Sequence, residues 1–369
     1  MVLAVGLMSG TSLDGIDAAL VETDGLAKVE PLAFLSEAYD AGFRARLQGF
    51  LGGRAARAPS EEVEAVEAEL TDRHAGLVGR LLAAAGRRPE EIAVVGFHGQ
   101  TVLHEPERRR TWQIGDGQRL ALALDIPVVG DFRSADVAAG GEGAPLAPLY
   151  HAARAASLER PLSVLNLGGV GNVTWIGAPP AGGEEPELLA FDTGPANALL
   201  DDWVAARAGL ACDLDGRLAL AGTVDRAILA RLLDHPYFSR RPPKSLDRDA
   251  WDVAELAPLS IEDGAATLTA FTAGSVALAQ RLLPEAPRRW LVTGGGRRNP
   301  ALLQALREEL GAIVEPVEAV GWNGDALEAE AFAYLAVRSL AGLPLSLPGT
   351  TGVPAPQAGG RLFRPRRAA

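Results

Sequence analysis

Apolar and polar positions follow two kinds of pattern along this chain of 369 residues. Short apolar runs of strand length predict buried β-strands at residues 2–7, 16–21, 92–97, 127–130 and 163–176, at the strand that ends at Asp192, and in WLVTGGGRRNP. Apolar residues at helical spacing predict helices near residues 61–85, from 117, after FDTGPAN with Pro195 near the first turn, and at 223–233, 265–283, 300–310 and 324–340. Residues 131–148 and the chain from residue 342 carry no such period, so loops are expected there.

One arrangement of these predicted elements occurs twice. GLMSGTSLDGIDAAL near the N-terminus and SVLNLGGVGNVTWIG from residue 163 each read as strand, glycine turn, strand, and alternating helices and strands follow each of them. The layout predicts a duplicated α/β architecture with a cleft between the two halves.

Composition narrows the class of protein. The formal charge of −12 argues against a surface for nucleic acid or for an anionic membrane. Cys212 is the single cysteine, which excludes an intrachain disulfide and favours a reducing compartment. The N-terminus lacks a basic segment before its apolar run, and no apolar run approaches the length of a membrane span. A cytoplasmic protein is therefore expected.

Three glycine-rich turns, SGTSLDG, LGGVGN and TGGGRRN, each follow an apolar strand. None of them is GxxxxGK[ST] or completes GxGxxG. Backbone N–H groups in such turns form nests that bind phosphate, and Thr11, Ser12 and Asn172 can add side-chain donors. Asp14 is placed to hold Mg²⁺ through water. A simple hairpin explains any one turn, but three together favour nucleotide phosphates.

Carboxylates occur at two places where chemistry is expected. Asp192 lies at a strand end before a helix, where it fits an N-cap and a general base equally well, and Thr193 could serve as the cap instead. Glu328 and Glu330 lie on a predicted helix, where a carboxylate on the apolar face needs a partner or a ligand. Exposure of both glutamates is the alternative.

Polar residues in FHGQT and DFRSAD suggest a substrate site. His98 and Gln100 follow a buried strand, and His98 fits either a structural histidine or a hydrogen bond to substrate. Arg133 lies in a charged glycine-rich stretch and fits a clamp for a substrate carboxylate, because a guanidinium matches a carboxylate in bidentate fashion. A surface ion pair with Asp131 or Asp136 is the alternative.

Eight motifs together resemble the anhydro-N-acetylmuramic acid kinases: GLMSGTSLDGIDAAL, FHGQTVLH, WQIGDG, DFRSADVAAGGEGAPLAP, LNLGGVGNVTWI, FDTGPANALLDDW, HPYFSRRPPKS and LEAEAFAYLA. The resemblance runs in order from residue 6 to about residue 352. It implies the duplicated fold of the sugar kinase, Hsc70 and actin superfamily. The domains expected are residues 1–132 plus 345–369, and residues 133–344 with the second phosphate hairpin, the general base and the adenosine turn.

The resemblance also implies the reaction and the site residues. Water adds at C1 of 1,6-anhydro-N-acetylmuramic acid, the bridge opens, and O6 takes the γ-phosphate of Mg-ATP. Asp192 matches the general base, and Glu328 rather than Glu330 is placed near the sugar. The expected nucleotide contacts are Gly10, Thr11, Ser12, Leu13, Asp14, Gly15, Ile16 and Asp17 in the first turn, Gly168, Gly169 and Asn172 in the second, and Gly294, Gly295, Gly296 and Asn299 in the third.

Two further functions remain open from the sequence. A conventional sugar kinase of the same superfamily would use Asp192 to deprotonate a sugar hydroxyl, and a nucleotide-gated sugar sensor would bind without turnover. A small-molecule substrate, no nucleic acid and no membrane are expected as partners, and the family suggests a homodimer.

Overall fold

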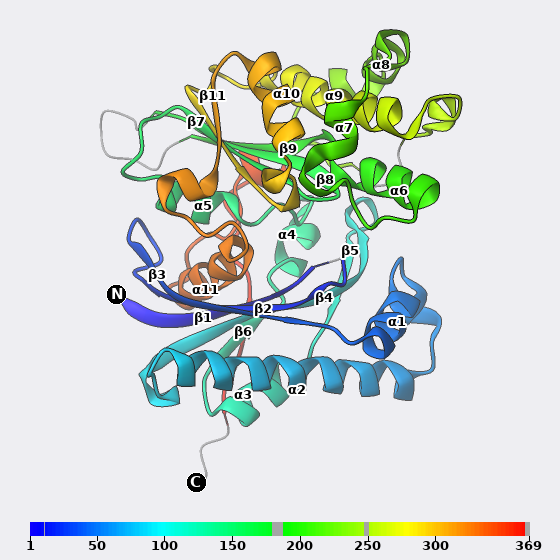
Figure 1. Ribbon diagram of the computed structural model, residues 1–369. Helices are drawn as coiled ribbons and strands as arrows, with labels where there is room; N and C mark the ends of the chain where they lie inside the picture. Colours follow the sequence, from blue (N-terminus) through cyan, green and yellow to red (C-terminus); the bar gives the residue numbers. More distant parts are fainter. Residues whose placement is uncertain (11, 179–186, 247–250, 366–369) are drawn as a thin grey trace. The chain divides into compact units, whose positions relative to one another are not determined.

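The computed structural model describes residues 1–10, 12–178, 187–246 and 251–365 (Figure 1). The chain divides into two compact units: unit 1 comprises Met1–Ser157 and Ala326–Ala369, and unit 2 comprises Leu158–Asp325. Among the described residues, no helix combines the length and the apolar character needed to cross a bilayer.

A mixed sheet forms the centre of unit 1. Its described strands are β1 (Val2–Ser9), β2 (Gly15–Thr23), β3 (Val29–Ala38), β4 (Ile92–Glu105), β5 (Arg110–Ile114), β6 (Val128–Gly130) and β12 (Arg361–Phe363). Strands β1, β2 and β3 form an antiparallel meander, and β4 and then β6 continue the sheet parallel to β1. Nearly continuous burial along the middle of β1 and β2 reflects the apolar runs that predicted them.

Helices cover both faces of this sheet. They are α1 (Ala41–Phe50), α2 (Ser60–Ala84), α3 (Gly117–Leu124), α4 (Ser134–Ala139), α5 (Pro148–Arg154), α11 (Leu327–Leu340) and α12 (Pro348–Thr351). Figure 1 shows α2 and α3 on one face and α11 on the other. Glycines let α11 approach closely: a Cβ on Gly6 would lie 1.8 Å from the Ala329 carbonyl oxygen, and a Cβ on Gly96 would lie 2.1 Å from that of Phe332.

Unit 2 repeats the strand order of unit 1. Its described strands are β7 (Leu162–Leu167), β8 (Val170–Ile176), β9 (Leu188–Pro195), β10 (Arg289–Thr293) and β11 (Ile313–Pro316). Strands β7, β8 and β9 form an antiparallel meander, and β10 and then β11 run parallel to β7. Its helices are α6 (Asn197–Ala208), α7 (Arg217–Ala221), α8 (Arg226–Leu233), α9 (Ile261–Gln280) and α10 (Pro300–Leu310). The shared order confirms the predicted duplicated α/β fold.

Several predicted boundaries differ from the structure. The stretch 131–148, expected to be a loop, contains α4 and ends at the start of α5, and the chain after residue 342 contains α12 and β12. The strand predicted at 92–97 continues to Glu105 because β5 pairs with its second half. Pro195 ends β9 instead of opening α6. Residues 133–157 and 326–344 belong to unit 1, although the sequence placed them in the second domain.

Candidate active site

The first glycine turn joins β1 to β2 in unit 1. Leu13 is buried and its amide donates to the Gly10 carbonyl at 3.1 Å, whereas Ser12 and Asp14 are exposed. A Cβ placed on Gly10 would meet nothing nearer than Ser12 Oγ at 3.5 Å, so the backbone here is open to a ligand. Thr11, the other predicted hydroxyl donor, lies outside the described residues. The turn therefore presents backbone, hydroxyl and carboxylate groups to solvent.

Asp14 and Asp17 are the carboxylates of this turn. The Asp14 side chain is 78% exposed and lies 3.8 Å from Arg44 Nη2, and Asp17 on β2 is half-buried. The described residues include no group of three or more His, Cys, Asp or Glu side chains able to hold a metal ion. Oxygen ligands of this kind suit a Mg²⁺ ion that keeps several waters and is shared with phosphates, and do not suit a closed protein cage.

The second glycine turn, at Gly168 and Gly169 in unit 2, is tied to the start of α6. The Gly169 carbonyl accepts hydrogen bonds from the amides of Ala196 at 3.1 Å and Ala198 at 3.2 Å, and the Gly168 carbonyl accepts one from Asn197 at 2.9 Å. The glycine carbonyls thus satisfy the first amides of the helix. Asn172 on β8 lies opposite Asp192 on β9, so a predicted nucleotide contact and the predicted base are cross-strand neighbours.

The third glycine turn, Gly294 to Gly296, packs against the end of β7. Gly294 has φ +73°, and a Cβ there would lie 2.4 Å from Asn166 Oδ1, which explains the need for glycine. Gly296 has equally little room, because its Cβ would lie 2.6 Å from the Leu167 Cβ. Gly295 is less confined: its Cβ would lie 3.5 Å from Asn197 Nδ2. The second and third turns are thus built against each other.

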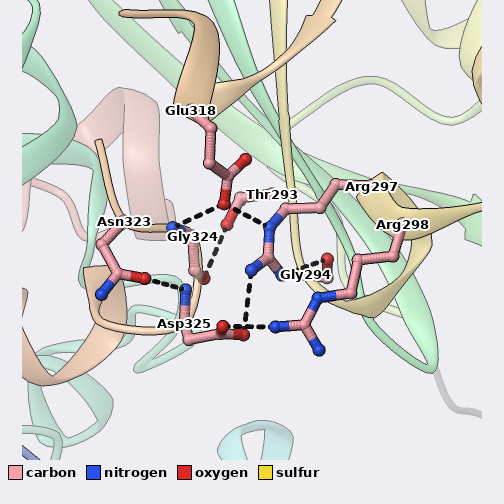
Figure 2. A network of polar contacts seen from close by, with 8 residues as sticks. All are labelled: Thr293, Gly294, Arg297, Arg298, Glu318, Asn323, Gly324 and Asp325. Atoms are coloured by element: carbon pink, nitrogen blue, oxygen red, sulfur yellow. Dashed lines mark hydrogen bonds and ion pairs between the residues drawn. The ribbon is translucent and has the colours of Figure 1, made fainter. Parts of the chain in front are cut away.

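A polar network holds the third turn in place (Figure 2). Arg297, only 7% exposed, donates to the Gly294 carbonyl at 3.0 Å and to Glu318 at 2.8 Å, and its Nη2 lies 3.0 Å from Asp325. Asn299 caps α10 by accepting the Leu302 amide at 3.2 Å. This structural role accounts for Asn299 without a ligand, so its predicted contact with a nucleotide stays a prediction. Nothing in the glycine spacing indicated the network.

Asp192 is surrounded by the segment that carries HPYFSRRPPKS. The Leu246 amide donates to Asp192 Oδ2 at 2.8 Å, the Tyr237 hydroxyl donates to the Asp192 carbonyl at 2.5 Å, and the Asp192 amide donates to the Lys244 carbonyl at 3.0 Å. Lys244 is 4% exposed, and burial lowers its pKa to about 8 although Asp192 opposes the shift.

The alternative role of an N-cap is wrong for Asp192. Helix α6 has Ala196 at its N-cap position and no side-chain cap. Thr193 does not cap it either, because Thr193 lies within β9 and its buried hydroxyl has no hydrogen-bond partner among the described residues. The Asp192 carboxylate is therefore positioned by backbone amide and strand geometry and is not used to start the helix.

Arg133 and His98 form a bonded pair in unit 1. Nε and Nη2 of Arg133 lie 3.0 and 2.9 Å from His98 Nε2, and His98 Nδ1 lies 2.7 Å from the Gly99 carbonyl oxygen. Because a guanidinium only donates, Nε2 must accept, and the proton of the neutral imidazole is on Nδ1. Burial and the neighbouring Arg133 charge hold the pKa of His98 well below its ordinary value. The geometry thus favours a structural His98 that orients Arg133.

Arg133 is half-buried and is not the surface residue of the alternative reading. Its Nη1 donates to the Gly143 carbonyl at 2.7 Å. In the part of the chain that the structure describes, no carboxylate lies within ion-pair distance of its guanidinium, neither that of Asp131 nor that of Asp136. Burial lowers its pKa to about 10, which leaves Arg133 charged at neutral pH.

The two glutamates of α11 have different surroundings. Glu330 is 2% exposed, accepts a hydrogen bond from the Tyr150 hydroxyl and lies 3.9 Å from Arg154 Nη1. Glu328 is exposed, yet the protein packed around its carboxylate raises its pKa; Arg133 opposes that shift and Asp17 adds to it. The Glu328 side chain is accessible to a ligand, whereas Glu330 makes its polar contacts in the interior of unit 1.

Gln100, the remaining predicted substrate residue, has no exposed surface on β4. Its Nε2 lies 3.5 Å from the Thr101 carbonyl oxygen, and its Oε1 has no hydrogen-bond partner among the described residues. A direct contact between Gln100 and a ligand would require the side chain to move. Its role in substrate binding therefore remains a prediction.

Comparison with known proteins identifies the family of the chain. A family model described as anhydro-N-acetylmuramic acid kinase matches residues 2–365. The chain belongs to this family. It is 58% identical to the anhydro-N-acetylmuramic acid kinase of Paramagnetospirillum magneticum, over 98% of this chain and all of that protein. It is 56% identical to the kinase of the same name from Rhizorhabdus wittichii, over 98% of this chain and 99% of that protein. The family resemblance predicted from the motifs is confirmed.

Among solved structures, this anhydro-N-acetylmuramic acid kinase family member is similar to the (R)-2-hydroxyglutaryl-CoA dehydratase component A of Acidaminococcus fermentans. The TM-score is 0.47 at 14% sequence identity, over 92% of this chain and all of that chain.

Proposed function

We propose that this chain uses ATP to phosphorylate 1,6-anhydro-N-acetylmuramic acid at O6 while water opens the anhydro bridge. The products are N-acetylmuramic acid 6-phosphate and ADP. Membership of the kinase family along residues 2–365 supports the activity and the sugar. The observation that carries the assignment of the substrate site is Arg133, a charged and half-buried guanidinium with no carboxylate within ion-pair distance among the described residues.

Arg133 is proposed to bind the lactyl carboxylate of the muramic sugar. Guanidinium–carboxylate pairs are bidentate and charge-assisted, and a guanidinium with no carboxylate in direct contact favours an anionic ligand. Neutral His98 on one side and the Gly143 carbonyl on the other orient the guanidinium without neutralising it.

Asp192 is proposed as the general base. It takes a proton from water as the water oxygen bonds to C1, the C1–O6 bond breaks, and O6 bonds to the γ-phosphorus as ADP leaves. Hydrolysis of a glycosidic bond ordinarily needs an acid for the leaving oxygen as well as a base for water. The phosphoryl group takes the place of that acid, so one base suffices. The Leu246 amide, bonded to Asp192 Oδ2, supports this role by fixing the carboxylate.

Glu328 is proposed to contact the sugar near the reacting carbon. Its side chain is accessible, and the protein packed around the carboxylate raises its pKa by desolvation. Charge that develops on a sugar ring is stabilised more strongly there than in water.

The glycine turns are proposed to hold the phosphates of ATP. The open backbone at Gly10 and the exposed Ser12 and Asp14 support this role for the first turn. Asp14 would hold Mg²⁺ together with water, and the ion would neutralise charge on the phosphates. The second and third turns, at Gly168 to Gly169 and Gly294 to Gly296, are proposed to bind the nucleotide as well.

The test is the release of ADP with 1,6-anhydro-N-acetylmuramic acid as acceptor, compared with glucose, N-acetylglucosamine and free N-acetylmuramic acid. Turnover only with the anhydro sugar supports the proposal. Faster turnover with a free 6-hydroxyl would favour a conventional sugar kinase, and binding of both ligands without ADP release would favour a sensor. A cytoplasmic location, suggested by the single cysteine and the apolar pattern, and a homodimer, suggested by the family, remain proposals.

A further inference from the structure

The loop GGEG, residues 140–143, closes around a buried carboxylate. Asp136 in the first turn of α4 is 2% exposed. It accepts hydrogen bonds from the Gly143 amide at 2.6 Å, from Thr351 Oγ1 at 2.6 Å and from Ser346 Oγ. No lysine, arginine or histidine within the described residues lies at ion-pair distance from it. A backbone amide and two hydroxyls therefore hold this carboxylate directly, and the Arg133 charge acts on it from beyond ion-pair distance.

Close packing around Asp136 explains the glycines of this loop. A Cβ on Gly141 would lie 2.2 Å from Asp136 Oδ1, and Gly143 has φ +70° with a Cβ position 2.5 Å from Val137 Cγ2. Side chains at these two positions would push the loop away from the carboxylate. The proposed reaction does not use these glycines directly. The packing around Asp136 requires them.

Gly143 connects this carboxylate to the substrate site. Its amide donates to Asp136, and its carbonyl accepts from Arg133 Nη1 at 2.7 Å. The segment that holds Asp136 from the other side adds a further contact, since the Glu142 amide donates to the Thr351 carbonyl at 2.7 Å. A continuous path of hydrogen bonds therefore runs from Thr351 through Asp136 and Gly143 to Arg133.

We propose that Asp136 is a positioning residue of the substrate site, which fixes Gly143 so that the Gly143 carbonyl aims the Arg133 guanidinium. The inference rests on the proposed function, in which Arg133 binds the substrate carboxylate. A long arginine side chain loses rotamer freedom when it binds, and a guanidinium held in advance loses less of it. The benefit of Asp136 should therefore appear in sugar binding and should depend on Arg133.

The test is a double-mutant cycle of Asp136→Asn with Arg133→Gln. Calorimetry measures binding of 1,6-anhydro-N-acetylmuramic acid, and initial rates give KM for the sugar and for ATP. Asp136→Asn is expected to weaken sugar binding about tenfold, the effect of one well-placed hydrogen bond, with KM for ATP unchanged. In the Arg133→Gln background the same change is expected to have no further effect on sugar binding.

Thr351→Val is the second variant, because it keeps the Asp136 carboxylate and removes one donor. It is expected to weaken sugar binding in the same way, to a smaller extent, and it keeps the test decisive if Asp136→Asn does not fold. Thr71→Val is the matched control: Thr71 Oγ1 donates to the Glu67 carbonyl at 2.7 Å and accepts from the Asp116 amide at 3.0 Å, remote from Arg133 in the bonding pattern. It should lower Tm and leave sugar binding unchanged.

Three results would overturn the inference. The first is a loss of Tm in Asp136→Asn and Thr351→Val with sugar binding unchanged. The second is the same weakening by Asp136→Asn in both Arg133 backgrounds, which would mean that Asp136 acts independently of the guanidinium. The third is unaltered sugar binding in Arg133→Gln alone, which would also remove the proposed role of Arg133. Only this last result counts against the proposed function. Failure of the Asp136 inference can therefore be distinguished from failure of the proposed function.

Discussion

Replacement of Arg133 by glutamine should separate binding of the sugar from binding of the nucleotide. The change removes the positive charge and the forked donors, and leaves a polar side chain that can still donate to the Gly143 carbonyl. His98 remains neutral, since burial is the largest cause of its low pKa. The fold is expected to persist, because the lost contacts of the guanidinium are offset by removal of a half-buried charge that has no carboxylate within ion-pair distance among the described residues.

The magnitude follows from the contacts that Arg133 can make with a carboxylate. Hydrogen bonds to charged groups contribute about 1.5–3 kcal/mol. At about 1.4 kcal/mol for each factor of ten, that loss corresponds to a rise of roughly 10- to 150-fold in KM for the muramic sugar. KM for ATP should not change, because no predicted nucleotide residue is bonded to Arg133 in the described chain.

The assay compares 1,6-anhydro-N-acetylmuramic acid with 1,6-anhydro-N-acetylglucosamine, which lacks the lactyl carboxylate. Arg133→Gln should raise KM for the first sugar and leave KM for the second unchanged. Arg109→Gln is the matched control, since it makes the same charge change at an exposed arginine whose Nη1 reaches the Ala138 carbonyl at only 3.5 Å. An equal rise in KM for both sugars, or a rise for ATP, would refute the reasoning.

Three further predictions concern the base, the helix α11 and the response to acid. Asp192→Asn should lower kcat by about 10²- to 10⁴-fold with ADP binding intact, as measured by steady-state kinetics and calorimetry. Glu330→Ala should destabilise the protein by about 3–5 kcal/mol in denaturant unfolding, because it leaves buried polar partners without their carboxylate, whereas Glu328→Gln should slow turnover with Tm nearly unchanged. Burial lowers the pKa of His74 and of His151 to about 4. Unfolding between pH 4 and about 6.5 therefore takes up protons. The free energy of unfolding should fall with acidification by up to about 1.4 kcal/mol per pH unit for each histidine.

For each of these predictions, one result would contradict it. Full turnover by Asp192→Asn would remove it from the reaction. Similar unfolding free energies for Glu330→Ala and Glu328→Gln would contradict the different burial of the two side chains. The raised pKa of Glu330 works against the histidines, because the folded state then binds a proton that the unfolded state has released. A stability that is independent of pH in a Glu330→Gln variant would show that the buried histidines do not control the acid response.

Apolar periodicity predicted most of the long elements of both units, but it missed β3, α1 and β11. The helix predicted at 61–85 is α2, and the helix at 300–310 coincides with α10, because long regular patterns depend on burial of one face. The predicted loop at 131–148 shows where periodicity fails. Helix α4 has six residues, which is too short for a pattern, and it forms around the hydrogen bonds of Asp136 with residues more than 200 positions away.

The same physical limit applies to the site. Motifs identified Asp192, Arg133 and Glu328, since their residue types and neighbours are readable locally. The sequence could not exclude an N-cap role for Asp192 or a surface ion pair for Arg133, because their bonding partners, Leu246 and His98, come from other elements of the fold. Long-range hydrogen bonds are the information that a single sequence leaves out.

The reaction in ¹⁸O-labelled water tests the central claim most directly. If water adds at C1 while O6 takes the phosphate, the N-acetylmuramic acid 6-phosphate product carries the label at C1, and its phosphate ester oxygen remains unlabelled. Mass spectrometry after quenching, before the anomeric hydroxyl exchanges with solvent, reads both positions. Label at C1 in the native protein, with none formed by Asp192→Asn, is the predicted result. An ADP-producing reaction that leaves C1 unlabelled would contradict hydrolytic opening of the bridge.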